Sequence, residues 1–270
     1  MLPGFQVIIL FERPSGNAGM ARAVTGMDEN LRRELARIRD GLTPATRITV
    51  LSGAGISAAS GIPTFRGEQD SLWSRYRPED LATPGAFARD PDLVWRWYDW
   101  RRGLIDAAAP NAAHLALARL EKTAPVVIVT QNVDGFHQEA GSTRVLEFHG
   151  SIWVVRCLGC GAEKLDRRVP MPLPAVCQQC GGRLRPGVVW FGEGIDPAVL
   201  HRSQSAASDC DLFLVIGTAG AVFPAAGLVG AAREAGARVI EFNLAPGGVS
   251  HLADLFVPGS AAETLPYLVP

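Results

Sequence analysis

The sequence lacks the features that would indicate a membrane protein, a disulfide scaffold or a nucleic-acid-binding protein. Its 270 residues contain no apolar run near the roughly 18 residues that a membrane-spanning helix needs. It has only five cysteines, and four of them form two Cys-x-x-Cys pairs, which suits metal binding in a reducing compartment better than disulfides. The net charge of −1 gives no general attraction to nucleic acid or an anionic membrane. We therefore expect a cytoplasmic protein without specific nucleic-acid or membrane partners.

The N-terminal 27 residues mix proline, glycine and alanine without a sustained hydrophobic period. The apolar run at 7–11 is too short for a signal-peptide core, and no basic residue precedes it. We expect residues 1–27 to be a loose, disordered extension or the product of an upstream start codon. A helix should begin at Asp28, because Leu31, Leu35 and Ile38 follow at helical spacing.

A glycine-rich turn follows the apolar run at 48–51. The residues Gly53, Ala54 and Gly55 are typical of a buried strand that breaks into a turn with little side-chain bulk. Such a turn lets backbone approach a ligand closely, and free N–H groups at the start of a following helix attract phosphate. However, no second strand ending in an acidic residue follows within about 20 residues. The turn is either a dinucleotide site in which the ribose is bound in another way than by such an acidic residue, or a strand–helix turn without a ligand.

Other apolar runs, at 126–130, 144–148, 212–216 and 238–242, also end in small or polar residues. Continuous apolar runs are expected for a parallel sheet covered on both faces, so we predict an α/β fold. Ligands of such sheets lie at the carboxyl ends of the strands. The residues at these ends are Gln131, Asn132, Val133, Asp134, His149, Gly217, Thr218, Ala219 and Asn243. A lone histidine is more often structural, but its position at a strand end favours a functional role for His149.

Two Cys-x-x-Cys pairs, Cys157 with Cys160 and Cys177 with Cys180, are separated by sixteen residues. Glycines beside each pair allow the tight turns that aim two thiolates at one tetrahedral ion. Four thiolates leave no position for water or substrate, so we predict one structural Zn²⁺. A redox Cys-x-x-Cys would not explain two matched pairs. Cys210 lies apart and is expected to be a buried, small apolar residue.

Several motifs resemble the sirtuins, the NAD-dependent protein lysine deacylases. They are GAGISAASGIPTFRG, TQNVD, FHG, the two cysteine pairs, VVWFGE, GT-x-x-x-V-x-P and a late Asn, in order from about Arg47 to the C-terminus. The resemblance implies a Rossmann-like large domain over 28–67, 123–150 and 187–270. It also implies a small domain made of a helical module at 68–122 and a zinc ribbon at 151–186.

The resemblance also assigns roles to residues. The cofactor loop would consist of Gly53, Ala54, Gly55, Ile56, Ser57, Pro63, Phe65 and Arg66. The nicotinamide and its ribose would be held by Gln131, Asn132, Val133 and Asp134. The adenosine end would be lined by Gly217, Thr218, Ala219, Asn243, Leu244 and Ala261.

The chemistry that the resemblance implies is acyl transfer from lysine to ADP-ribose. The acyl oxygen attacks ribose C1′ as nicotinamide leaves beside Asn132 and Asp134, and the products are free lysine, nicotinamide and O-acyl-ADP-ribose. His149 is expected to be the general base, since a neutral imidazole near its reference pKa of about 6.5 suits that task.

The substrate peptide is expected to add as a strand between the stretch at 188–193 and the loop after Gly217. We expect the 186–193 stretch to be extended and exposed.

Tyr98 and Arg101 fall on one helix face. They resemble the acyl pocket of sirtuins that remove succinyl or malonyl groups. The alternative is that Arg101 is one of many surface arginines. The expected substrate-binding residues are Ala82, Tyr98, Arg101, Val188, Val189, Phe191 and Gly192.

The sequence departs from the family pattern at two positions. Ala219 replaces the usual serine, and Ala245 replaces a glutamate that would contact the adenosine ribose. Loss of a charged hydrogen bond could weaken NAD binding by roughly 1–3 kcal/mol. Two alternatives stay open: a protein mono-ADP-ribosyltransferase, and a non-catalytic NAD-sensing binding module.

Overall fold

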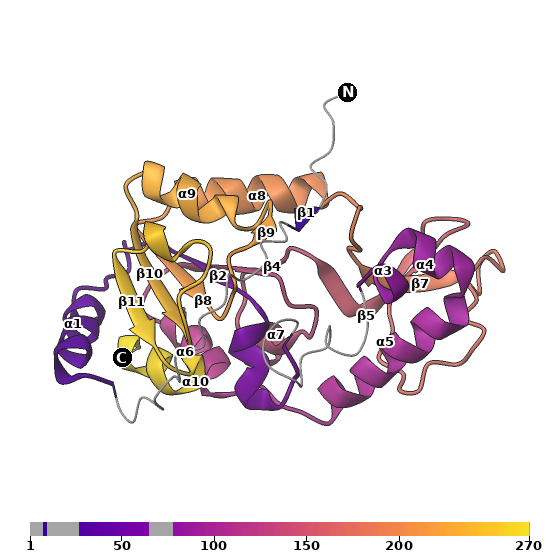
Figure 1. Ribbon diagram of the computed structural model, residues 1–270, viewed down its shortest axis with the longest axis horizontal. Coiled ribbons are helices and arrows are strands. Elements are labelled where there is room, and N and C mark those ends of the chain that lie inside the picture. Colours follow the sequence, from indigo (N-terminus) through magenta and orange to yellow (C-terminus); the bar gives the residue numbers. More distant parts are fainter. Residues whose placement is uncertain (1–7, 10–26, 65–77, 270) are drawn as a thin grey trace, which may run out of the picture.

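The computed structural model describes residues 8–9, 27–64 and 78–269 (Figure 1). Two of the expected cofactor residues, Phe65 and Arg66, lie outside the described residues. In Figure 1 a layered α/β unit occupies one side, and a smaller unit of helices and antiparallel strands occupies the other. Within the described ranges, no helix is both long enough and apolar enough to cross a membrane.

The α/β unit is built on a six-stranded sheet in which every neighbouring pair is parallel. The spatial order is β11-β10-β8-β2-β3-β4. The strands are β2 (Ile48–Ser52), β3 (Val126–Thr130), β4 (Val145–Glu147), β8 (Leu212–Ile216), β10 (Arg238–Asn243) and β11 (Leu255–Pro258). Because β2 pairs with β3 on one side and with β8 on the other, the order reverses at β2, where parallel sheets bind ligands. The predicted α/β fold is confirmed.

Helices cover both faces of the sheet. The core of one face includes residues of α1 (Glu29–Asp40), α6 (Ala112–Leu120), α10 (Ala261–Thr264) and η3 (Leu265–Leu268). The other face carries α8 (Pro197–Ser208) and α9 (Gly227–Glu234), with η2 (Ser250–Leu252) beside α9. The predicted helix start is confirmed, since the Asp28 carboxylate caps α1 by accepting from Asn30 N at 3.1 Å.

The smaller unit packs three helices against a three-stranded antiparallel sheet. Its elements are α3 (Pro78–Leu81), α4 (Pro84–Arg89), α5 (Pro91–Asp106), β5 (Gly150–Cys157), β6 (Glu163–Leu165) and β7 (Leu184–Val188). Its core contains several buried aromatic rings, including Trp95 and Trp153. Arg102 of α5 is completely buried and donates from Nε (2.9 Å) and Nη2 (2.7 Å) to the Ile152 carbonyl, which ties α5 to β5.

Two expectations for loops need correction. The stretch at 186–193 is not an exposed loop, because β7 is buried throughout and Trp190 is only 2% exposed. It packs between β5 and the helices, so apolar residues there fill a core. In the N-terminal segment, Ile8–Ile9 form a strand, β1, which pairs antiparallel with β9 (Val222–Phe223).

Candidate active site and metal centre

The carboxyl ends of the central strands come together at one edge of the sheet. The Ser52 hydroxyl, at the end of β2, donates to Thr130 Oγ1, at the end of β3, over 2.9 Å. The N–H of Gly53 donates to the carbonyl of Ile216, at the end of β8, over 3.0 Å. The residues that follow these three strands are therefore neighbours, as the sequence predicts for a ligand crevice.

The glycine-rich turn packs against the turn after β8. It continues as a 3₁₀ helix, η1 (Ala54–Ser60), and Gly55 N donates to Gly217 O at 2.8 Å. A Cβ on Gly55 would lie 2.7 Å from Gly217 Cα, and one on Gly53 would lie 2.8 Å from Thr218 Cβ. These glycines are thus required for contact between two turns, and their N–H groups are already used within the protein.

A buried polar cluster follows β2 and β3. The Ser57 hydroxyl donates to Asp134 Oδ2 at 2.8 Å and accepts from Asn132 Nδ2 at 3.1 Å. The other oxygen of Asp134 accepts from Phe136 N at 3.0 Å, at the start of α7 (Phe136–Glu139). Burial raises the pKa of Asp134, while the hydrogen bonds from Phe136 and Ser57 oppose that shift. The predicted Ser57, Asn132 and Asp134 therefore form one hydrogen-bonded unit.

Two buried histidines lie next to this cluster, with His114 Nε2 3.5 Å from Ser57 Oγ, and no sequence motif marked either of them. His137 Nε2 donates to Ser52 Oγ at 2.8 Å, because the Ser52 hydroxyl itself donates to Thr130. His114 Nδ1 accepts from Asn111 N at 3.2 Å, and its ring lies 5.0 Å from that of His137. Burial lowers the pKa of His114 to about 4 and that of His137 to about 3, so both rings are neutral.

His149 presents one bare ring nitrogen. Its Nδ1 donates to the carbonyl of Gln131 at 3.1 Å, which fixes the neutral tautomer with the lone pair on Nε2. Among the described residues, the buried Nε2 has no hydrogen-bond partner. Burial lowers the pKa of His149 from the expected value near 6.5 to about 4. Nε2 is therefore a proton acceptor at neutral pH.

A second polar chain links β3 to β10 across the turn after β8. Gln131 Nε2 donates to Thr218 Oγ1 at 2.9 Å, and Asn243 Nδ2 donates to the Thr218 carbonyl at 2.9 Å. Asn243 Nδ2 also donates to Oε1 of Glu241 at 3.1 Å. Glu241 is completely buried in β10, and its Oε2 has no partner within the described part of the chain. No motif marked Glu241, although a charged residue inside an apolar strand was a visible signal.

The expected acyl-pocket residues gather on the buried face of α5 and the segment after β7. Tyr98 is 3% exposed and Arg101 is 8% exposed, so Arg101 is not a surface arginine. Burial lowers the pKa of the Arg101 guanidinium, and neighbouring Tyr98 and Asp134 oppose that shift. Phe191 N donates to the Ala82 carbonyl at 3.0 Å. Arg101 thus connects the α5 face electrostatically to the polar cluster of Asp134.

The substrate stretch is continuous with the histidine site. Val189 N donates to the carbonyl of His149 at 2.8 Å, and Val188 pairs with Gly150. Gly192 has a φ of 85°, a left-handed conformation that favours glycine.

Other expected cofactor residues lie in varied surroundings. Ile56 and Ala261 are buried in the sheet core, and Leu244 is 75% exposed. Ala54, Pro63, Val133 and Ala219 lie between these extremes, with Ala219 the most exposed of the four. The Ile56 side chain therefore lies in the sheet core, not in the polar cluster, and is not accessible.

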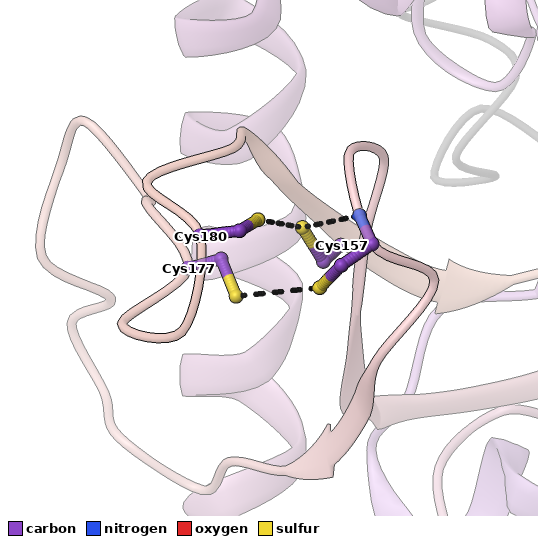
Figure 2. Close-up of side chains that lie close together, drawn as sticks. Cys157, Cys177 and Cys180 are labelled. Carbon is purple, nitrogen blue, oxygen red and sulfur yellow. Dashed lines mark hydrogen bonds between the residues drawn. The ribbon is translucent and has the colours of Figure 1, made fainter.

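The four predicted zinc ligands form a cluster at the end of the three-stranded sheet. Their Sγ atoms lie within 4.8 Å of one another (Figure 2). Cys157 and Cys180 are separated by 3.5 Å, and Cys160 and Cys177 by 3.9 Å. Tetrahedral zinc with bonds of about 2.3 Å requires sulfur–sulfur distances near 3.8 Å, so the donor set fits one Zn²⁺. Cys210 is 5% exposed and lies apart in the core, as expected.

These features define a parallel α/β protein of the dinucleotide-binding type, with a buried polar cluster at its strand-order reversal and an attached four-cysteine module. Residues 53–224 match the model of the Sir2 family. The chain belongs to this family.

The chain is similar to curated relatives over nearly their full length. It is 50% identical to NAD-dependent protein deacylase 2 of Pyrobaculum aerophilum, over 86% of this chain and 93% of the relative. It is also 50% identical to the NAD-dependent protein deacylase of Aquifex aeolicus, over 81% and 92%. The solved complex of a Sir2 homologue with NAD is 42% identical, with a TM-score of 0.80, over 92% of this chain and 94% of that one.

Proposed function

We propose that this protein is an NAD-dependent protein lysine deacylase that removes succinyl and malonyl groups as well as acetyl groups. The observation that carries the proposal is the bare Nε2 of His149, whose ring is bound to the carbonyl of Gln131, the residue that precedes Asn132 of the Ser57–Asn132–Asp134 cluster. Relatives that are 50% identical over most of both chains carry the deacylase name. A general base and a polar cluster at the strand-order reversal are parts that this reaction needs.

Bound NAD would supply an electrophilic ribose carbon once nicotinamide leaves. Asn132 and Asp134 would orient the nicotinamide amide and the ribose, because their side chains are already fixed through Ser57. Thr218 and Asn243 would line the adenosine end, where one chain of hydrogen bonds joins them. Such preorganised polar groups act without reorganising during the reaction.

His149 would accept a proton from a ribose hydroxyl through Nε2. The Gln131 carbonyl fixes the tautomer, and burial keeps the ring neutral at physiological pH. The zinc would have no role in this proton transfer, since four thiolates fill its coordination sphere.

The acyl preference rests on Tyr98 and Arg101. Both lie on the buried face of α5, and Arg101 lies within electrostatic reach of Asp134. A planar guanidinium donates two parallel hydrogen bonds to a carboxylate, which suits a dicarboxylic acyl chain. The peptide backbone would pair with the segment after Val188 and with the loop after Gly217. Main-chain pairing predicts weak preference for peptide sequence.

An acyl-peptide panel tests the proposal. Acetyl, malonyl, succinyl and long-chain lysine peptides would be incubated with and without NAD. We expect NAD-dependent release of free lysine and nicotinamide, lost in His149→Tyr while zinc stays bound. Arg101→Met should lose desuccinylation and keep some deacetylation. Equal loss of both activities in Arg101→Met would remove the acyl-pocket assignment, and stable transfer of labelled ADP-ribose to protein would favour a transferase instead.

A further inference from the structure

Trp190 contacts the acyl-pocket tyrosine directly. It follows β7 and is 2% exposed, and its indole Nε1–H donates to the Tyr98 hydroxyl oxygen at 2.9 Å. Within residues 27–64 and 78–269, Trp190 is the hydrogen-bond partner of that hydroxyl. Trp190 is one of the largest fully buried side chains.

An ion pair holds Trp190 in place. Arg185 is 5% exposed and donates to both carboxylate oxygens of Glu193, at 2.5 and 2.9 Å. Glu193 Oε2 also accepts from Trp190 N at 2.8 Å, so the carboxylate fixes the tryptophan backbone. The Arg185 guanidinium lies 3.5 Å from the centroid of the Trp190 ring, which fixes the side chain as well. The indole therefore has one orientation, with its N–H directed at Tyr98.

This contact decides how the tyrosine can act. A phenol has one hydrogen and accepts through its oxygen, and an indole N–H can only donate. Because Trp190 occupies the accepting side of the oxygen, the Tyr98 hydrogen is left to be donated elsewhere. Burial raises the pKa of Tyr98, so the hydroxyl keeps that hydrogen at physiological pH. A donor beside the Arg101 guanidinium favours an anionic acceptor.

We propose that Trp190, clamped by Arg185 and Glu193, determines acyl specificity by fixing the Tyr98 hydroxyl as a hydrogen-bond donor to the distal carboxylate of a dicarboxylic acyl chain. Trp190 is a positioning residue, because it acts through Tyr98. The inference rests on the proposed deacylase function and its acyl preference. It adds the reason why the tyrosine would distinguish a carboxylate from a methyl group.

The test measures kcat and KM for succinyl and acetyl peptides at saturating NAD in Trp190→Phe, Tyr98→Phe and the double variant. Trp190→Phe should raise the KM for the succinyl peptide about 3- to 10-fold, the range of one net hydrogen bond. The KM for the acetyl peptide should change less than about twofold. In the Tyr98→Phe background, Trp190→Phe should have no further effect on the succinyl KM, because the donor is already absent.

Phe87→Leu is the matched control. The Phe87 ring packs on Trp190 with centroids 5.3 Å apart and makes no polar contact with it. It should change the KM for both peptides by the same factor. The inference is overturned if Trp190→Phe affects both peptides equally, or if its effect persists in Tyr98→Phe. A wild-type enzyme that removes acetyl but not succinyl overturns the acyl proposal and this inference together, and that failure is seen before any variant is made.

A second measurement covers the case in which Trp190→Phe does not fold. The indole ¹H–¹⁵N resonance of Trp190 would be assigned in the wild-type protein and followed in Tyr98→Phe. We expect this resonance to move upfield while the other tryptophan indoles stay in place. An unmoved Trp190 resonance would show that the hydrogen bond is absent and would overturn the inference.

Discussion

Buried, neutral histidines should make this protein sensitive to mild acid, and His114 and His137 act in the same direction as His149. His114 and His137 are 0% and 1% exposed. Burial lowers their pKa values from 6.5 to about 4 and about 3. Between pH 6.5 and 4 the unfolded chain therefore binds more protons than the folded chain. The stability that neutral histidines contribute is complete above pH 6.5 and is lost as the pH falls.

The loss of folding stability at low pH can be worked out from how far burial lowers the pKa of each histidine. Each such group changes the free energy of unfolding by about 1.4 kcal/mol per pH unit inside the window. At pH 5, about 1.5 units below the unfolded pKa, each histidine costs about 2 kcal/mol, so the pair costs about 4 kcal/mol. A typical domain is stable by only about 5–15 kcal/mol, so the loss is measurable. Asp134, whose pKa burial raises, acts in the opposite direction.

Urea unfolding of the wild type and of His137→Gln at pH 8, 7, 6 and 5 isolates one of the two histidines. Glutamine does not titrate and can still donate to Ser52, so the variant should lose about 2 kcal/mol less than the wild type between pH 8 and 5. The exposed His201→Gln serves as the control and should follow the wild type. Parallel pH profiles for the wild type and His137→Gln would refute the assignment of a neutral, buried ring.

Three further outcomes are expected. Gly55→Ala places a Cβ 2.7 Å from backbone of the facing turn and should cost about 1–3 kcal/mol in urea unfolding, whereas Gly230→Ala, with open space around it, should cost nothing. If both variants are equally stable, the close packing of the two turns is not required. Ala245→Glu should restore a carboxylate at the adenosine ribose and tighten NAD binding about fivefold or more by calorimetry; an unchanged Kd contradicts that position. Metal analysis should find one zinc per chain, lost in Cys177→Ser and kept in Cys210→Ser; zinc retained in both would contradict the four-thiolate site.

Local patterns predicted most of the sheet. The runs at 48–51, 126–130 and 212–216 match β2, β3 and β8 almost residue for residue, because strands buried on both faces are continuously apolar. Helix α8 was missed because its few apolar residues hide the helical period. The segment at 186–193 was misread because its burial depends on β5 and α5, which are distant in sequence.

The residues of the candidate site were also predicted only in part. Motifs identified Ser57, Asn132 and Asp134, and the structure brings these three side chains into one cluster. They did not identify His137, because a buried hydrogen-bond partner has no local sequence signature, or Glu241, whose place inside an apolar strand belongs to no motif. The low pKa of His149 could likewise not be predicted from the sequence, because it arises from burial by surrounding elements and not from neighbours in the chain. The domain boundaries and the individual cofactor contacts stay predictions.

The strand β5 runs between the two chemically distinct centres of the molecule. It begins directly after His149 and ends at Cys157, and its pairing with β7 shifts register between Gly150 and Val155. The metal site thus lies at the end of the strand that begins next to His149. Removal of the zinc ion should allow β5 to shift and should thereby impair turnover, although zinc contacts no reacting atom. Inactivation by a chelator would therefore be no sign of Lewis-acid catalysis in this enzyme.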